Sequence, residues 1–420
     1  MAEYIPRLVD LDIQKNLDVF GAVLIAGPKW SGKTTSAEQI AKSIVSMQDP
    51  DNSERYIAIA RNKPSLLLKG EKPRLIDEWQ VEPKIWDAVR YSVDREGMPG
   101  LYILTGSVTP LEDPKHHTGI GRIARVEMRN MSLFESGDST GEVSLKGLFS
   151  GEEVSGTSLL DYTEMSEVLV RGGWPTSIGK DVDRSAIIVR GYCEGLLETE
   201  VDLPGGKKRD KQKMRRLLRS LSRHIATEAT NTTIAGDMAA FESESISANT
   251  ISDYMTALRE IYVLEDLEAW SPKLRSKTAI RTSAVRHLSD PAIAAYFLGA
   301  GAYDLQMDPN TYGLLFESLV VRDLRIYARV NDGDVYHYRD ADGLEVDTVV
   351  HLHNGKWGAI EVKLGMDGVD AGAKNLLRLA KKVDQEAMNP PSFLAVVVAS
   401  GYAYTRDDGI HVIPLGCLRD

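Results

Sequence analysis

The feature that most constrains the fold of this chain is a glycine-rich motif near its N-terminus, Gly27-x4-Gly32-Lys33-Thr34. The motif follows a short apolar run at residues 22–26, which predicts a buried strand, and precedes a helical pattern that continues through Ile44. A strand, a glycine-rich loop and a helix in this order are the context that a phosphate-binding loop requires. The glycines let backbone N–H groups surround phosphate oxygens, and the N-terminus of the helix adds positive potential. We therefore predict nucleotide binding at this loop.

The loop also supplies side chains that bind a nucleoside triphosphate and its metal ion. Lys33 is expected to reach the β and γ phosphates, and Thr34 to offer its hydroxyl to Mg²⁺, so ATP and Mg²⁺ are the predicted cofactors. A fortuitous glycine-rich turn is the alternative, which the placement between a strand and a helix disfavours. The residues predicted to line the site are Gly27, Pro28, Lys29, Trp30, Ser31, Gly32, Lys33, Thr34, Thr35, Asp77 and Ser107.

An acidic pair, Asp77-Glu78, ends the next apolar run. Asp77 is predicted to hold the Mg²⁺ shell together with Thr34, and Glu78 to orient or activate the attacking water. A third apolar run ends in Thr105-Gly106-Ser107, where a hydroxyl could sense the γ-phosphate or, as the alternative, cap the following helix. Strands that alternate with helices predict a parallel sheet with helices on both faces.

The length of 420 residues exceeds one ordinary core and predicts three domains. The second third of the chain has a mostly helical apolar pattern. The last third combines a helix, a β-hairpin pattern around Asn354-Gly355, another helix and a strand. The expected division is a nucleotide-binding domain at residues 1–150, an α-rich domain at 151–305 and an α/β domain at 306–420.

Composition limits the class of protein to which this chain can belong and indicates its cellular compartment. The net charge of −11 argues against a protein that coats nucleic acid with its whole surface, although local basic patches are compatible with it. The N-terminus has no basic stretch leading into an apolar one, and the longest apolar runs are far shorter than the ~20 residues of a membrane helix. We expect a cytoplasmic protein without membrane contact, in which Cys193 and Cys417 are ordinary thiols.

Together these motifs resemble a prokaryotic family that joins an AAA-type ATPase module to a C-terminal domain of unknown function. The resemblance runs nearly from end to end and implies an AAA-type domain at residues 1–150. Among the segments that carry the resemblance, Arg171–Pro175 is interpreted as a tight structural turn whose Trp174 packs between domains. The segments that carry the resemblance are Tyr4–Asp10, Gly27–Thr35, Ile76–Gln80, Leu104–Ser107, Gly121-Arg122 and Arg171–Pro175.

The same resemblance implies an arginine that meets the γ-phosphate, where it offsets transition-state charge. Such an arginine acts within its own subunit or on a neighbouring subunit of a homo-oligomer. Gly121-Arg122 matches the glycine–arginine element of the family, so Arg122 is the candidate and Arg125 the second choice. A surface arginine without this role is the alternative.

Two features indicate DNA as a partner. The basic stretch 207–216, continued by Arg219 and Arg223, is typical of a phosphate-contacting patch, with a solvated helix face as the alternative. Residues 245–264 have the pattern of the short helix, turn and second helix of a winged helix-turn-helix, with Ser247 starting the second helix; the family resemblance implies the same element. We expect duplex or branched DNA, or a protein partner if the winged helix packs against protein instead.

In the last domain, Asp347 and Glu361-Val362-Lys363 resemble the active-site signature of the PD-(D/E)XK nuclease superfamily, with Glu317 as a fourth candidate. Glu361 and Lys363 are two positions apart on a strand and therefore point to one face. Asp347, Glu361 and Glu317 are the predicted metal ligands, and Lys363 would offset charge on the attacked phosphate. The alternatives are an exposed hairpin with ordinary charges and a nuclease fold kept only for binding.

The register of the hairpin decides whether this second site can form. A two-residue turn at Asn354-Gly355 in perfect register would pair Asp347 with Val362 and turn it away from Glu361 and Lys363. An odd-length loop or a β-bulge near Asp347 is therefore required.

The predicted fold is α/β, with a P-loop AAA-type parallel sheet domain, an α-rich winged-helix-like middle domain and a C-terminal PD-(D/E)XK nuclease-like α/β domain. Our leading hypothesis is an ATPase whose nucleotide state controls DNA engagement, with nuclease activity as a further expectation. A non-catalytic nucleotide switch that binds a protein partner is the main alternative. A small-molecule kinase is a third, but it would need neither the hairpin carboxylates nor the winged helix.

Overall fold

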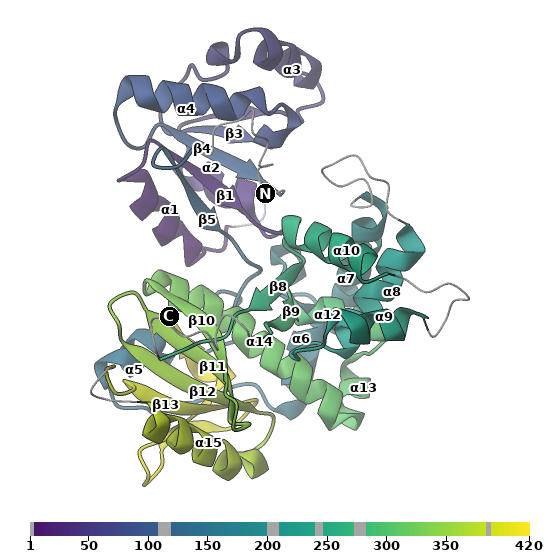
Figure 1. Ribbon diagram of the computed structural model, residues 1–420. Coiled ribbons are helices and arrows are strands. Elements are labelled where there is room, and N and C mark those ends of the chain that lie inside the picture. The colour runs from purple at the N-terminus through teal and green to yellow at the C-terminus, as the bar shows by residue number, and fades with distance from the viewer. Residues whose placement is uncertain (1–3, 108–118, 200–209, 240–246, 273–282, 384–387) are drawn as a thin grey trace. The chain divides into compact units, whose positions relative to one another are not determined.

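The computed structural model describes residues 4–107, 119–199, 210–239, 247–272, 283–383 and 388–420 (Figure 1). The chain divides into two compact units, Met1–Asn130 with Glu260–Tyr262 and Met131–Arg259 with Val263–Asp420. The boundary at Asn130 differs from the one predicted at residue 150, because β6 (Val143–Ser144) pairs in parallel with β16 (Leu418–Arg419). A further division of the second unit at residue 305 stays a prediction.

The first unit is built on a parallel sheet of five strands in the order β2-β3-β4-β1-β5. β1 and β4 are buried along their whole length, as their unbroken apolar runs predict. The predicted alternation of strands and helices in a parallel sheet is confirmed. The strands are β1 (Ala22–Ala26), β2 (Ser43–Ser46), β3 (Arg74–Asp77), β4 (Tyr102–Gly106) and β5 (Ile123–Glu127).

Helices cover both faces of this sheet, so each face has its own core. Ile25 of β1 packs in one core with Leu17 of the first helix, whereas the neighbouring Leu24 packs in the other core with Val89 of the fourth. This alternation follows from the period of two along a strand. The helices are α1 (Val9–Leu17), α2 (Lys33–Ile40), α3 (Ser53–Asn62) and α4 (Lys84–Glu96).

One part of the predicted helix after the loop is wrong. Helix α2 ends at Ile40, where the chain becomes extended at Ala41, and Ile44 lies instead in the edge strand β2 with 47% of its surface exposed. Helical and strand patterns are hard to separate in a short apolar segment. The edge position explains why β2 has no continuous apolar run.

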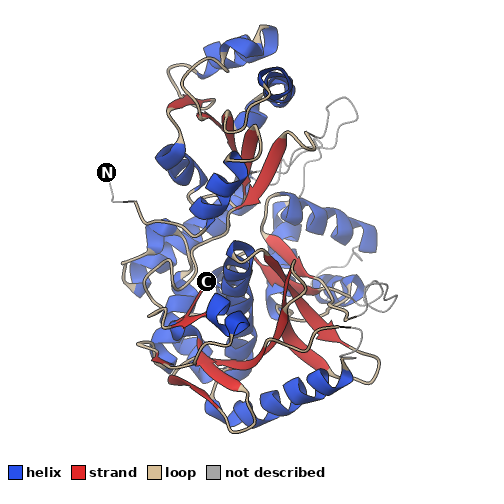
Figure 2. Ribbon diagram, turned by 90° about the vertical axis from the view of Figure 1, so that its left-hand side faces the viewer, coloured by secondary structure: helices blue, strands red, loops and turns tan. Residues whose placement is uncertain are grey.

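Between residues 145 and 307 the second unit is mostly helical, in agreement with the helical pattern of the sequence; helices are blue in Figure 2. A two-stranded antiparallel hairpin, β8 (Leu264–Leu267) with β9 (Val285–Leu288), lies between α10 and α12 in the chain. Thr227 forms an isolated antiparallel bridge to Arg286 at this hairpin. The helices are α5 (Leu145–Ser150), α6 (Tyr162–Arg171), α7 (Val182–Thr199), α8 (Lys211–Arg223), α9 (Asn231–Ala239), α10 (Ala248–Glu260), α12 (Pro291–Leu298) and α13 (Ala302–Met307).

The prediction for residues 245–264 needs one correction. Ser247 starts the helix α10 as predicted, and its hydroxyl accepts the Thr250 N–H at 3.1 Å. The described part of this segment contains no other helix, and the last described helix before α10 is α9, which lies earlier in the chain. The polar residues at the start of α10 are a capping signal, which locates one helix end but carries no information about the helix before it.

The last part of the chain forms a mixed sheet of seven strands in the order β10-β11-β12-β13-β15-β14-β7. Helix α14 (Pro309–Val330) contacts β10, β11 and β12, and α15 (Val369–Lys382) contacts β11, β12 and β13. The hairpin, both helices and the strand predicted here are confirmed, whereas β10, β14 and β15 were not predicted. The strands are β7 (Gly156–Thr157), β10 (Gly333–Arg339), β11 (Glu345–Leu352), β12 (Trp357–Lys363), β13 (Phe393–Val398), β14 (Tyr402–Thr405) and β15 (His411–Pro414).

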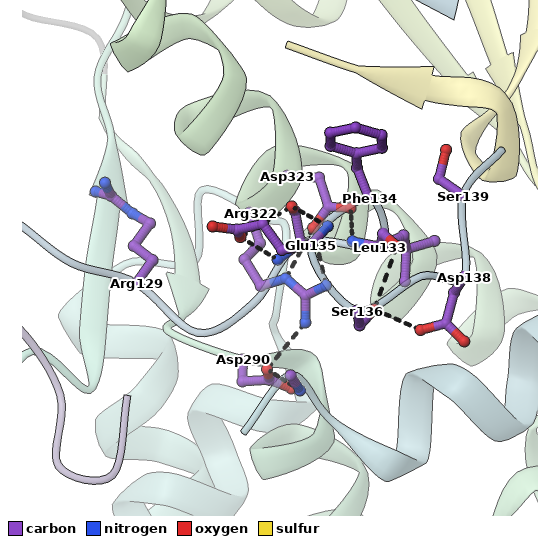
Figure 3. A network of polar contacts seen from close by, with 12 residues as sticks. Arg129, Leu133, Phe134, Glu135, Ser136, Asp138, Ser139, Asp290, Arg322 and Asp323 are labelled. Atoms are coloured by element: carbon purple, nitrogen blue, oxygen red, sulfur yellow. Dashed lines mark hydrogen bonds and ion pairs between the residues drawn. The ribbon is translucent and has the colours of Figure 1, made fainter. Parts of the chain in front are cut away.

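A buried ionic network connects segments of the second unit that are far apart in sequence (Figure 3). Arg322 donates to Asp290 at 2.9 Å and to Asp323 at 2.9 Å, and Asp323 accepts the Leu133 N–H at 2.9 Å. The two carboxylates are fully buried and Arg322 nearly so. Removing one partner of a buried ion pair leaves an uncompensated charge, so this network fixes how these segments pack.

The Arg171–Pro175 turn, which the sequence analysis interpreted as structural, joins the same network. The Gly173 N–H donates to Asp290 at 2.9 Å, and a side chain at Gly173 would lie 2.4 Å from the Met131 carbonyl oxygen. Trp174 is fully buried, but it stacks on Tyr192 of α7 within the α-rich region. Gly173 therefore contacts the other segments of the network.

Candidate nucleotide site and a second acidic site

The phosphate loop follows β1 and leads into α2, and its glycines have conformations that other residues rarely adopt. Gly27 has φ +152° and Gly32 has φ +99°. A Cβ atom at Gly27 would lie 2.0 Å from the Met128 carbonyl oxygen, so no side chain fits at this position. The loop is thus shaped by close packing against the end of β5.

Lys33 is the first residue of α2 and only 6% of it is exposed. Its Nζ atom donates to the carbonyl oxygens of Gly27 at 3.0 Å and Pro28 at 2.7 Å. Burial lowers the pKa of Lys33 to about 8, against the opposing effect of Glu78 and Asp77. A desolvated ammonium in this position gains most when an anion enters the loop, because phosphate oxygens replace weaker neutral acceptors.

Asp77 ends β3, and its carboxylate accepts hydrogen bonds from hydroxyl groups of three segments. Its Oδ1 atom accepts from Thr34 at 2.7 Å and from Thr105 at 2.6 Å, and its Oδ2 atom accepts from Ser46 at 3.2 Å. The structure therefore brings Thr34 and Asp77 together, as the predicted metal shell requires. Hydroxyl and carboxylate oxygens are ligands that suit Mg²⁺, so the donor set fits this ion.

The proposed sensor residues lie at the end of β4. Thr105 pairs with Asp77 in the parallel ladder, and its hydroxyl donates a hydrogen bond to that carboxylate. Ser107 is buried two residues further on. The helix that Ser107 was alternatively expected to cap falls outside the described residues.

Glu78 is held by a residue that the sequence motif did not single out. Gln80 Nε2 donates to Glu78 Oε2 at 2.5 Å, and Glu78 itself has a left-handed φ of 55°. Burial raises the pKa of Glu78, while the hydrogen bond from Gln80 opposes this shift. The signal for Gln80 was its place two residues after Glu78, but no chemical pattern distinguished it from an ordinary surface glutamine.

Arg122 lies at the opposite end of the sheet from the phosphate loop. The Ala22 N–H at the start of β1 donates to the Arg122 carbonyl oxygen at 3.1 Å, whereas the loop follows the last residue of β1. Five strand residues at ~3.3 Å each separate the two ends by about 16 Å. The Arg122 side chain instead pairs with Asp94 at 2.8 Å. A contact with the nucleotide of its own subunit is therefore excluded, and a contact between subunits stays a prediction.

Arg125, the second candidate for the γ-phosphate contact, faces Tyr262. Its guanidinium donates to the Tyr262 hydroxyl at 2.5 Å and lies 5.5 Å from the centre of that ring. This contact gives Arg125 a structural role in the first unit.

The second acidic site forms on β11 and β12, and its register meets the geometric requirement. The ladder pairs Thr348 with Ile360, which places Asp347 opposite Glu361 rather than opposite Val362. The Leu352 N–H donates to the Lys356 carbonyl oxygen at 2.8 Å, so the loop between these residues is three residues long. This odd-length loop turns Asp347, Glu361 and Lys363 to one face.

Lys363 is the cation at this face. Its Nζ atom lies 2.6 Å from Glu361 Oε2 and 3.5 Å from Asp347 Oδ2. Burial and then the charge of Asp347 raise the pKa of Glu361 to about 7, although Lys363 opposes the shift. The Val362 N–H fixes Asp347 Oδ2 at 2.7 Å, so the aspartate cannot rotate freely.

Glu317 on α14 interacts with Asp347, Glu361 and Lys363 through its charge. Burial raises its pKa well above the usual range, and the charge of Asp347 adds to this effect. In the described parts of the chain, no three His, Cys, Asp or Glu side chains converge closely enough to hold a metal ion. The predicted ligands Glu317, Asp347 and Glu361 therefore do not form a metal-binding cluster as they stand, and the Lys363 ammonium neutralises Asp347 and Glu361 instead.

The predicted basic patch is partly neutralised within the second unit. On α8, Lys211 pairs with Glu198 at 3.1 Å, Arg215 with Glu194 at 2.6 Å and Arg223 with Asp237 at 3.1 Å. Lys213 and Arg219 have no ionic partner among the residues that the structure describes. Residues 207–209 of the basic stretch fall outside the described ranges.

The exposed face of α10 is neutral. It consists of small residues and short polar side chains, and Arg259 at its end pairs with Asp266 at 2.6 Å. A helix that reads DNA bases usually presents Arg, Lys, Asn or Gln. The exposed residues of α10 are Ala248, Asn249, Ser252 and Thr256, among which only Asn249 is of a base-reading type.

Comparison with known families divides the chain in three. Residues 20–136 match an AAA domain, residues 162–304 a domain of unknown function (DUF8612) and residues 312–418 another domain of unknown function (DUF4143). The AAA match, with the loop geometry, supports ATP binding and hydrolysis with a divalent metal ion in the first unit. Neither of the other two matches bears on DNA binding or nuclease activity.

Two curated relatives and several solved structures are similar to this chain. Uncharacterized proteins of Mycobacterium tuberculosis and Mycobacterium bovis are each 24% identical over 346 residues, which is 81% of this chain and 70% of theirs. The Walker-type ATPase PABY2304 of Pyrococcus abyssi aligns with a TM-score of 0.43 at 13% identity, over 69% of this chain and 94% of that one. The Aeropyrum pernix ORC1 protein in complex with DNA aligns with a TM-score of 0.25 at 13% identity, over 74% and 95%. In the described residues, no helix is long and apolar enough to cross a membrane.

Proposed function

We propose that this chain hydrolyses ATP at its phosphate loop and uses the nucleotide state to control DNA engagement by its second unit. The observation that carries the first part is the hydrogen bond of 2.7 Å between Thr34 Oγ1 and Asp77 Oδ1, beside the buried Lys33. Lys33 and Thr34 at the start of α2 and Asp77 at the end of β3 are groups needed for phosphoryl transfer, and they meet at one loop.

The chemistry assigns a separate task to each side chain. Lys33 exchanges the Gly27 and Pro28 carbonyls for the β and γ phosphates, and the loop N–H groups surround the same oxygens. Thr34 and Asp77 are the residues that would hold Mg²⁺, which neutralises charge on the phosphates. Glu78, whose raised pKa reflects its burial, exchanges its hydrogen bond with Gln80 for one with the attacking water.

Glu78→Gln tests this assignment. The amide keeps the shape and the Gln80 contact but cannot accept a proton, so ATP should still bind while turnover falls by about 100-fold or more. Binding is measured by fluorescence titration and turnover by steady-state phosphate release. Equal loss of binding and turnover would remove the role assigned to Glu78.

DNA engagement is supported by the order of elements in the second unit. Helix α8, the Thr227 bridge, helices α9 and α10 and the β8–β9 hairpin follow one another as in a winged helix-turn-helix. On α8, Arg219 lines a cavity of about 310 Å³ with Ser222 and Thr311. We assign phosphate contacts to Lys213 and Arg219, which have no ionic partner among the described residues.

Replacing both Lys213 and Arg219 with alanine tests this interface. Each lost phosphate contact reduces the magnitude of the slope of log K against log salt by ~0.9. The slope measured on duplex DNA should therefore be shallower by roughly 2 for the double variant. Affinity is measured by fluorescence anisotropy at several salt concentrations, with Lys180→Ala/Lys374→Ala as the matched control. An unchanged slope would contradict the interface. No measurable DNA binding by the natural chain would favour the nucleotide switch with a protein partner, which the neutral face of α10 also suits.

A second candidate activity is metal-dependent cleavage of DNA at the β11–β12 site. It is supported by the position of Asp347 opposite Glu361, with Lys363 between their carboxylates. Asp347, Glu361 and Glu317 are the residues that would hold a divalent ion there, and Lys363 would then turn to the attacked phosphate.

A further inference from the structure

The segment Tyr4–Asp10, which leads into the first turn of α1, has no role in the function proposed so far. Arg7 in this segment is buried, with only 6% of its surface exposed. The guanidinium donates from Nη1 to the Ser31 carbonyl oxygen at 2.8 Å and from Nη2 to the Arg129 carbonyl oxygen at 2.8 Å. An arginine side chain therefore joins the back of the phosphate loop to the end of β5, in the first unit.

The contact with Ser31 fixes the direction of a neighbouring N–H group. The Ser31 C=O and the Gly32 N–H belong to one planar trans peptide unit, so they point in opposite directions. Because Arg7 holds the oxygen on the outer side of the loop, the Gly32 N–H is directed toward its inner side, where a phosphate-binding loop presents its donors. Gly32 has φ +99° and no side chain to resist rotation, so a restraint from outside is needed.

The rest of the segment anchors Arg7 on both sides of the loop. Asp10 Oδ2 accepts the Arg7 N–H at 2.9 Å and the Tyr4 hydroxyl at 2.6 Å. The Tyr4 hydroxyl also lies 2.8 Å from Ser36 Oγ on α2. The segment thus contacts the chain before Lys33, through Ser31, and after it, through Ser36.

We propose that Arg7 is a positioning residue of the ATP site, which orients the Ser31–Gly32 peptide so that its N–H group binds a nucleotide phosphate. The inference rests on the proposed function of the loop. It adds a residue outside the loop motif and gives the Tyr4, Arg7 and Asp10 side chains a common task. A merely structural role would lower stability without changing the affinity of the folded protein for nucleotide.

The test compares Arg7→Lys and Arg7→Ala with the natural chain and with Arg55→Ala, an exposed arginine on α3 of the same unit. Lysine keeps the charge but lacks the planar fork that bridges two carbonyls. Both Arg7 variants should bind ATP about 10- to 100-fold more weakly, as expected for a lost or misdirected hydrogen bond to a charged group. Millimolar methylguanidinium should restore affinity in Arg7→Ala and leave Arg7→Lys unchanged.

Isothermal titration is carried out well below the thermal midpoint of each variant, which circular dichroism provides. If Arg7→Ala does not fold, Arg7→Lys gives the result on its own. Folded Arg7 variants with the ATP affinity of the natural chain would overturn the inference and leave the ATP site intact. Absence of ATP binding by the natural chain would overturn the ATP site itself, and the inference with it.

Discussion

Replacing Lys33 with alanine should weaken ATP binding by about 100-fold or more, since a charged hydrogen bond and a full charge on the phosphates are lost together. The loop carbonyls of Gly27 and Pro28, which now accept from Lys33, would face the phosphates without a cation between them. The exposed Lys42, just after α2, provides the matched control as Lys42→Ala. Binding is measured by titration with a fluorescent ATP analogue.

The stability of the Lys33 variant separates a local effect from misfolding. Burial lowers the pKa of Lys33 to about 8, so the folded chain loses free energy by keeping this ammonium desolvated. Lys33→Ala should therefore unfold at the same or a higher temperature. A variant that folds normally and still binds ATP as tightly as the natural chain would contradict the proposed site.

Asp347→Ala should abolish metal-dependent DNA cleavage, with a fall of at least about 100-fold, because it removes a predicted metal ligand and the group opposite Glu361. Lys363 can still pair with Glu361 at 2.6 Å, so no buried charge is left alone and the fold should persist. Cleavage of linear, flapped and four-way DNA is followed with Mg²⁺ and with Mn²⁺. Asp334→Ala, at an exposed position on the neighbouring strand β10, is the control.

Two outcomes would contradict the nuclease proposal. Cleavage that survives Asp347→Ala would come from a contaminant. No cleavage of any substrate by the natural chain would leave the β11–β12 site as a lysine-neutralised acidic face in a binding domain.

The nucleotide site could be predicted from sequence because its determinants are local. The loop glycines, Lys33 and Thr34 lie within one short segment, and Asp77 follows a short apolar run that indicated a buried strand. Gln80 could not be assigned, since its role depends on the left-handed turn at Glu78. Arg7 acts through backbone oxygens, which no residue pattern reveals.

The second unit was harder to predict because its charges are paired across the fold. The basic residues of α8 are clustered in sequence, but their partners Glu194 and Glu198 lie on α7. At the hairpin, Asn354-Gly355 is typical of a two-residue turn, whereas the loop also includes His353. Hydrophobic alternation indicated both strands but not their register, which the loop length determines.

The most direct test of the ATPase account is the release of inorganic phosphate from ATP by the purified natural chain, with Mg²⁺ and with EDTA, beside Lys33→Ala. The account predicts phosphate release that requires Mg²⁺ and that Lys33→Ala lacks. It would be contradicted if the natural chain released no phosphate, or if release were equal in EDTA or in Lys33→Ala.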